Sequence, residues 1–265
     1  SLPENLTTMG HYVFVGTFTD TQPSAQEIIF RGQSSRVFQY LPTEKDGKWT
    51  KLLTDYTVGD PTTIYALMGS STINTFTISK KITTIYEGAF SGIKTLNRLA
   101  VNTENKYFKA EGDIDDYCTR LYSKDGTKLY AVLANDNVDY EKLSFPNVTV
   151  VGAYAFCNFK DASVKTVEFS MKLVEMHEGA FAGAENLTNI DISKSALTEI
   201  ASNTFRNCKS LSDIALPSKI RYIGKNAFFA SGLTSVELPD LLFEISDGAF
   251  AGCEKITSVY LSNTD

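Results

Sequence analysis

The segment GAFSGIKT, residues 88–95, has two glycines followed by a lysine and a threonine, and it therefore suggests a phosphate-binding loop. A P-loop needs the spacing G-x-x-x-x-G-K-[ST], because its backbone N–H groups surround the phosphate while the lysine contacts it. Here only three residues separate Gly88 from Gly92, and Ile93 precedes Lys94. Two later segments, GAFAGAEN and GAFAGCEK, have the same pattern with glutamate in place of the lysine. The spacing therefore favours a repeated turn over a nucleotide site.

Histidine is the side chain that most often binds zinc or acts as a general base. The chain has two histidines, His11 and His177, which lie in separate segments and form no H-E-x-x-H pattern. We therefore expect two surface histidines and no shared zinc site. No motif supports a Ser-His-Asp triad, so the sequence indicates neither an enzyme nor a cofactor.

Four cysteines could form disulfides in a secreted chain. Cys208 and Cys253, however, each follow a phenylalanine by three residues, in a position that Ala184 fills in a related segment. This position suits a small buried side chain, so we expect free thiols there. Cys118 and Cys157 could pair only if the segment between them folds back.

Acidic side chains gather in one part of the chain, and carboxylate oxygens are ligands for calcium. Their spacing does not follow an EF-hand, which favours a solvated, charged hairpin over a calcium site. The residues concerned are Glu111, Asp113, Asp115, Asp116, Asp136 and Asp139.

Composition limits the classes of partner. The net charge is −6, and a mildly acidic chain lacks the basic surface expected for nucleic acid or for anionic lipid. No apolar run approaches the roughly 20 residues of a membrane helix. The first residues, SLPENLTTMG, have neither the basic nor the apolar region of a signal peptide, so we expect no signal or lipid anchor within this chain.

An internal repeat organises the chain. Seven phenylalanines share the same surroundings: an apolar residue stands five positions before each of them, another stands eight positions before, and alanine usually precedes them directly. Each repeat is too short to bury its own apolar side chains, so consecutive repeats must stack as turns of a solenoid. We expect these anchors in its core: Phe14, Phe90, Phe156, Phe181, Phe205, Phe228 and Phe250.

A second pattern, L-x-x-L-x-L, follows most anchors and ends in the alternation that is typical of a half-buried strand. Examples are Leu187/Ile190/Ile192, Leu211/Ile214/Leu216 and Leu233/Val236/Leu238. The segment LPSKIRYIGKNAFFASGLTSVELP, residues 216–239, closely resembles the BspA-like, Treponema-type leucine-rich repeat. This resemblance implies a leucine-rich-repeat solenoid, a right-handed superhelix of short parallel β-strands joined by short helical or irregular turns.

We expect one solenoid domain over residues 1–265 with insertions at 31–72 and 102–139. Each insertion contains a Lys-Asp-Gly turn between candidate strands, which predicts a β-hairpin. Both are rich in aromatic residues, which either pack the hairpins onto the solenoid or form a binding protrusion. These aromatics are Trp49, Tyr56, Tyr65, Tyr117, Tyr122 and Tyr130.

The third and fifth positions of L-x-x-L-x-L should point away from the core and form a surface for binding. The resemblance implies a non-catalytic cell-surface or secreted module, and some such proteins adhere to host matrix proteins or to other cells. We expect a monomer that recognises a protein or glycan partner, with a structural spacer that presents another domain as the alternative. The candidate binding residues are Glu168, Asn189, Asp191, Asp213, Glu237 and Tyr260.

Overall fold

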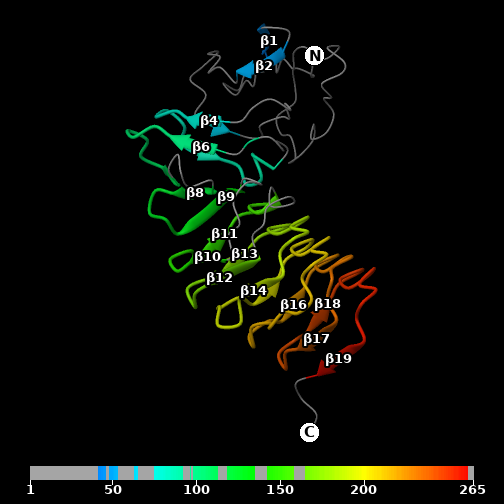
Figure 1. Ribbon diagram of the computed structural model, residues 1–265. Coiled ribbons are helices and arrows are strands. Elements are labelled where there is room, and N and C mark those ends of the chain that lie inside the picture. Colours follow the sequence, from blue (N-terminus) through cyan, green and yellow to red (C-terminus); the bar gives the residue numbers. More distant parts are fainter. Residues whose placement is uncertain are drawn as a thin grey trace, which may run out of the picture.

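The computed structural model describes residues 41–45, 48–52, 63–64, 75–91, 96, 98–112, 118–134, 142–157 and 165–261. Over residues 142–157 and 165–261 the chain winds into stacked turns with short strands and almost no helix (Figure 1). The fold is the β-solenoid that the repeat predicts. Of the two anchors before this region, Phe90 is described, whereas Phe14 lies outside the described residues, as does the first histidine, His11.

The longer strands form at the L-x-x-L-x-L pattern and pair in parallel between successive turns. Leu143 lies beside Val167, and Val167 lies beside Ile190, so equivalent positions of the repeat are aligned. The alternating burial of these strands confirms that every second side chain enters the core. The strands of this type are β4 (Thr75–Ile78), β6 (Arg98–Val101), β10 (Lys142–Phe145), β12 (Thr166–Phe169), β14 (Asn189–Asp191), β17 (Ser235–Leu238) and β19 (Ser258–Leu261).

One expected strand is not formed. Residues 211–216 are not in a β-strand, although Leu211 and Ile214 are buried as the pattern requires. The side chain of Asp213 accepts a hydrogen bond from the Ile214 N–H at 2.9 Å. This local bond competes for an amide that a strand would use in the ladder, and it interrupts the sheet between β14 and β17.

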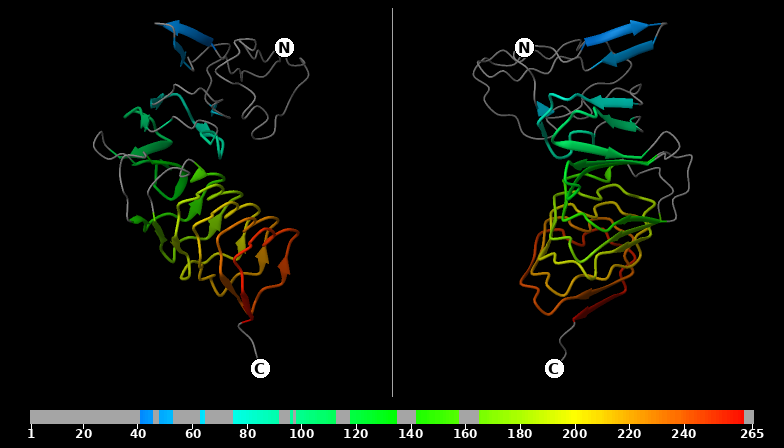
Figure 2. Two further views of the ribbon diagram at one scale, coloured as in Figure 1. Left: turned by 45° about the vertical axis from the view of Figure 1, so that its right-hand side comes forward. Right: turned by 90° about the vertical axis from the view of Figure 1, so that its left-hand side faces the viewer.

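A second ladder of two-residue strands runs along another side of the turns (Figure 2). Six of its seven described strands end at the apolar residue five positions before an anchor, so that Ile200 lies beside Ile223 and Ile223 beside Ile245. These strands are β3 (Thr63–Ile64), β5 (Thr84–Ile85), β11 (Val150–Val151), β13 (Glu175–Met176), β15 (Glu199–Ile200), β16 (Tyr222–Ile223) and β18 (Glu244–Ile245).

Both expected insertions contain antiparallel hairpins, and both also take part in the ladder of short strands. The first hairpin consists of β1 (Leu41–Lys45) and β2 (Lys48–Leu52), and β3, within the same segment, pairs in parallel with β5. In the second, β7 (Phe108–Glu111), β8 (Cys118–Ser123) and β9 (Lys128–Ala134) form an antiparallel meander. Strand β9 pairs in parallel with β11, so this meander continues the ladder.

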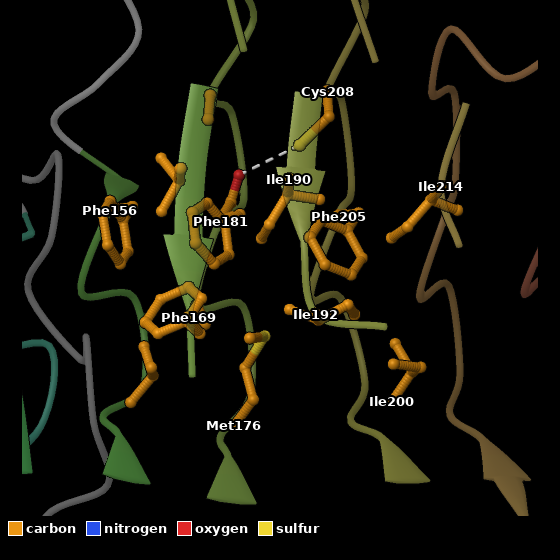
Figure 3. Packing of buried hydrophobic residues seen from close by; sticks show 14 of the residues in the cluster. Phe156, Phe169, Met176, Phe181, Ile190, Ile192, Ile200, Phe205, Cys208 and Ile214 are labelled. Atoms are coloured by element: carbon orange, nitrogen blue, oxygen red, sulfur yellow. Dashed lines mark hydrogen bonds between the residues drawn. The ribbon is translucent and has the colours of Figure 1, made fainter. Parts of the chain in front are cut away.

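Stacked aromatic rings fill the centre of the solenoid (Figure 3). The rings of Phe156 and Phe181 are 4.2 Å apart between centroids, and each following pair of anchors is 5.1–5.5 Å apart at a small interplanar angle. Phe90 is buried in a second cluster with the inward side chains of β6 and β9. Each ring from Phe181 to Phe228 contacts the rings of the turns before and after it, so the anchors form one aromatic column through these turns.

The turn before each of the six described anchors has a residue in the left-handed backbone region, where glycine is favoured and asparagine is tolerated. The sequence shows glycine there in three repeats only. At the equivalent position the other repeats place Tyr154 with φ 55°, Asn203 with φ 60° and Asn226 with φ 54°. The glycines are Gly88, Gly179 and Gly248, with φ of 70°, 61° and 67°.

Candidate functional site

The outward side chains of the longer strands form the candidate binding surface, which we call the strand face. It comprises Glu168, Asn189, Asp191, Asp213, Glu237 and Tyr260. In the sheet β10–β12–β14 the register places Glu168 directly beside Asp191, and Thr166 beside Asn189. Parallel pairing therefore brings together two carboxylates that lie far apart in the sequence. Each points away from the core, because the alternate side chains of both strands are buried.

Nearby polar groups contact both carboxylates of this pair. Lys142 Nζ lies 2.6 Å from Glu168 Oε1, at the outer strand of the same sheet. Asp191 Oδ1 accepts hydrogen bonds from the N–H and the hydroxyl of Ser193, at 3.2 and 2.8 Å. The aspartate is thus oriented by local bonds, whereas the lysine offsets the charge of the glutamate.

The other strand-face residues lie on different parts of the ladder. Glu237 on β17 lies beside Tyr260 on β19, in a separate two-stranded sheet. Asp213 lies in the interrupted segment between β14 and β17, and its carboxylate is engaged with the neighbouring amide. Five of the six residues therefore form two groups, and Asp213 lies in the break between them. Tyr260, which is 58 % exposed, is the aromatic side chain of the set.

The aromatic side chains of the second hairpin that can be placed contact the solenoid. Tyr122 is buried in the core, and the half-buried Tyr130 packs edge-on against Phe108 with ring centroids 5.5 Å apart. The packing interpretation is therefore correct for Tyr122, whereas Tyr130 is only half-buried and its contact with Phe108 lies within the second insertion. Tyr56, Tyr65, Tyr117 and the side chain of Trp49 lie outside the described residues.

Of the six acidic residues expected in a charged hairpin, only Glu111 lies among the described residues. Glu111 Oε1 lies 3.0 Å from Lys109 Nζ, and the five aspartates of the cluster lie outside the described residues. In the part of the chain that is described, no group of three or more His, Cys, Asp or Glu side chains is arranged to hold a metal ion.

His177 differs from the expected surface histidine. Its Nδ1 lies 2.7 Å from Glu87 Oε2, and its Nε2 lies 3.0 Å from Glu175 Oε2. Glu87 also contacts Lys128 Nζ at 2.5 Å and accepts a hydrogen bond from the Ala153 N–H at 2.7 Å. The side chain of His177 is 34 % exposed and that of Glu87 is 18 % exposed, so this cluster is partly shielded from water.

The cluster changes the protonation of both partners. Burial opposes the charge of Glu87, but the bonds from His177, Lys128 and the Ala153 amide outweigh it and lower the pKa of this carboxyl to about 2. The hydrogen bond to Glu87 raises the pKa of His177 above 6.5, against the opposing effect of partial burial. An imidazolium–carboxylate pair is therefore favoured at mildly acidic pH.

The sequence did contain a signal for this cluster. Glu87 stands three residues before its anchor and His177 four residues before a later anchor, and one repeat lies between them. That repeat has Gly152 and Ala153 at these two positions, and a Cβ on Gly152 would lie 3.4 Å from the Glu87 Cγ. Two small residues in the middle repeat thus leave room for a contact between its neighbours.

Cys157, Cys208 and Cys253 are free cysteines, which confirms the free thiols expected at Cys208 and Cys253 and excludes the Cys118–Cys157 pair. The Cys208 thiol donates a hydrogen bond to the Phe181 carbonyl of the preceding turn at 3.2 Å (Figure 3). Cys253 donates equivalently to the Phe228 carbonyl at 2.9 Å. The position is therefore buried at Cys208 and partly buried at Cys253, and in both turns a carbonyl oxygen accepts a hydrogen bond from the thiol.

The first residues of the segment 88–95, which suggested a phosphate-binding loop, form the turn of a repeat. Gly88 has the positive φ of its equivalents Gly179 and Gly248, and the Ser91 N–H donates to the Gly88 carbonyl at 3.0 Å. Residues 92–95, which include the lysine, lie outside the described residues. Within the described ranges, no helix is long and apolar enough to span a membrane.

Known proteins resemble this chain in sequence and fold. The family model described as "BspA type Leucine rich repeat region" matches residues 62–111 and 133–257 with six copies. No match is found among curated protein sequences.

Two solved structures share the fold. A leucine-rich cell surface protein from Faecalibacterium prausnitzii A2-165 is 22 % identical, with a TM-score of 0.62 over 77 % of this chain and 52 % of that one. The pneumococcal vaccine antigen PcpA is 20 % identical, with a TM-score of 0.59 over 76 % of this chain and 49 % of that one. The chain thus spans about half the length of either structure.

Proposed function

This chain belongs to the BspA-type leucine-rich repeat family, and from that premise we propose that it is a non-catalytic binding module of a cell-surface or secreted protein. Its strand face, assisted by the hairpins, recognises a protein or glycan partner. The F. prausnitzii structure with the same fold is described as a cell surface protein, which supports this location. The module acts as a monomer and uses no cofactor.

The observation that carries the proposal is the register of β12 and β14. It places the carboxylates of Glu168 and Asp191 side by side on an outward surface, where nothing in the solenoid core requires them. Repetition of the turn extends this surface along the stack, which is the arrangement that solenoids use for binding extended partners. An acidic strand face favours partners with basic groups or with many hydrogen-bond donors.

Charge reversal tests the proposal. The triple variant Glu168→Lys, Asp191→Lys and Glu237→Lys should weaken binding to immobilised matrix proteins and to arrayed glycans, measured by surface plasmon resonance and by array fluorescence. The effect should shrink as salt rises, because exposed charges are screened over about 8 Å at physiological ionic strength.

A matched control reverses three exposed glutamates elsewhere, Glu199, Glu244 and Glu254. The control should bind as the wild type does while having the same net charge as the triple variant. If both variants bind every wild-type partner equally well, the strand face is the surface of a spacer and the proposal is wrong. Size-exclusion chromatography with light scattering tests the monomer.

A further inference from the structure

A cleft of about 710 Å³ opens where the ladder of short strands is discontinuous. Strand β5 pairs with β3, whereas β9, β11 and β13 belong to a different sheet and lie side by side in Figure 1. The cleft lies between these two sheets and is lined by residues of both, including Ile85 from β5 and Lys128 from β9. Its volume is within the range of small-molecule sites.

Three tyrosines line this cleft. Tyr86 follows β5 and is 37 % exposed, whereas Tyr130 and Tyr154 are half-buried. Lys128 Nζ lies over the Tyr130 ring, 5.2 Å from its centroid. Tyrosine combines a flat apolar face with a polar hydroxyl, so three of them give the cleft apolar surfaces beside hydrogen-bonding groups.

The polar groups of the cleft are held in fixed positions. Glu87 is bonded by Lys128, His177 and the Ala153 amide, as described above. Glu178 Oε1 accepts hydrogen bonds from the Tyr154 hydroxyl and from Asn203 Nδ2, each at 3.1 Å. A site whose polar groups are oriented before binding loses less entropy when a ligand enters.

Tyr154 also has a strained backbone. Its φ of 55° is in the left-handed region, which is unfavourable for a bulky residue. Its ring occupies the space beside Gly179, where a Cβ would lie 2.4 Å from the ring. The same backbone conformation recurs at this position of the other described repeats, so it belongs to the turn, and in this repeat it is a tyrosine that lines the cleft.

The charges of the cleft nearly cancel. Its lining contains the carboxylates of Glu87 and Glu178 and the cations Lys128 and His177, the latter when protonated. The lining is therefore neutral at mildly acidic pH and carries one negative charge when the imidazole is neutral. Such a site gives no net attraction to an anion such as phosphate, and Glu87, the more buried carboxylate, is already paired.

We propose that the cleft between β5 and β9–β11–β13 is a binding site for a neutral saccharide. The Tyr86 ring packs against the apolar face of a sugar ring, while Glu178 and the tyrosine hydroxyls bond its hydroxyl groups. None of the lining residues belongs to the strand face, so this site is separate from the proposed partner surface and does not depend on it.

Ligand-observed NMR and isothermal titration calorimetry of the full 265-residue chain test this site. The neutral probes are cellotriose, maltotriose and N,N′,N″-triacetylchitotriose; sialyllactose and N-acetyl-arginine amide are the charged comparisons. At least one neutral trisaccharide should bind more tightly than either charged probe. Tyr86→Ala should weaken that binding by about tenfold, the loss expected for an aromatic contact at the centre of a site.

Tyr222→Ala is the matched control, because Tyr222 is similarly exposed at 43 % and lies on β16, outside the cleft. It should bind the sugar as the wild type does. Glu178→Gln, which keeps the size of the side chain, should also weaken binding, and circular dichroism should show that both cleft variants remain folded. The proposal is overturned if no neutral trisaccharide binds, if a charged probe binds more tightly, or if Tyr86→Ala and Tyr222→Ala behave alike.

Discussion

His177 Nδ1 lies 2.7 Å from Glu87 Oε2, although 90 residues separate the two in the chain. The contact joins the turn after β5 to the residue after β13, across an intermediate turn that has Gly152 and Ala153 at the same positions. It thus links the segment before the hairpin meander to the regular solenoid after it.

The contribution of the Glu87–His177 pair to the free energy of unfolding should depend on pH along a bell-shaped curve. The pKa of Glu87 is lowered from 4.5 to about 2, so its contribution is present above pH 4.5 and is lost as the pH falls toward 2. The pKa of His177 is raised, so its contribution is present below pH 6.5 and is lost as the pH rises through the raised value. Both contributions are therefore present between pH 4.5 and 6.5.

Urea unfolding at several pH values measures this contribution. Glu87→Gln should lower the free energy of unfolding by about 1–3 kcal/mol within that window. Its own stability curve should lose the acidic limb and keep only a reduced alkaline limb, because Glu175 still bonds His177 Nε2. His177→Gln should remove the alkaline limb while retaining the acidic one, because Lys128 and the Ala153 amide still bind the carboxylate. A difference between wild type and Glu87→Gln that does not vary with pH would contradict the ion pair.

Truncation of an anchor should be costly. Phe181 is fully buried between the rings of Phe156 and Phe205, so Phe181→Ala should lower the free energy of unfolding by about 3–5 kcal/mol. Phe243→Ala, at a ring that is 77 % exposed, should change it by less than about 0.5 kcal/mol. Equal losses in denaturant titrations would show that the aromatic column does not hold the turns together.

Replacing alanine by glycine should have opposite effects on stability at two positions of one repeat. Ala230 has φ 52°, which costs an L-residue about 1–2 kcal/mol, whereas glycine loses about 0.4–1 kcal/mol through the entropy of the unfolded chain. Ala230→Gly should therefore raise the free energy of unfolding by a few tenths to about 1 kcal/mol. Ala227→Gly, at a buried position of the same repeat, should lower it. A loss of stability in both variants would show that the left-handed backbone at residue 230 is not strained.

The Cys208 thiol should resist alkylation in the folded protein. Burial raises its pKa well above the usual value, and the thiol is already bonded to the Phe181 carbonyl. Iodoacetamide followed by mass spectrometry should leave Cys208 unmodified in the native state and modified in urea, with no disulfide at any stage. Labelling of native Cys208 at the rate seen in urea would refute its burial.

The repeat could be predicted because each turn places apolar side chains at the same positions in one core. The apolar positions around Phe181 and Phe205 imply stacked rings, and L-x-x-L-x-L implies aligned strands such as Val167 beside Ile190. The outward position of Glu168 and Asp191 follows from the same alternation. Asp213 is the exception, because a single side-chain bond to the next amide replaced the strand that the pattern predicts.

Sequence by itself therefore determined the solenoid, its register within the regular turns and the small position that holds Cys208, since all three depend on a repeated spacing. Only the tertiary structure decided how the meander enters the stack. Nothing in residues 102–139 specifies that β9 pairs with β11, or that Lys128 meets Glu87 beside it. An insertion interrupts the repeat, so the number of residues between two segments no longer says which of their residues lie side by side. From that point the neighbours of a side chain depend on how the segments pack.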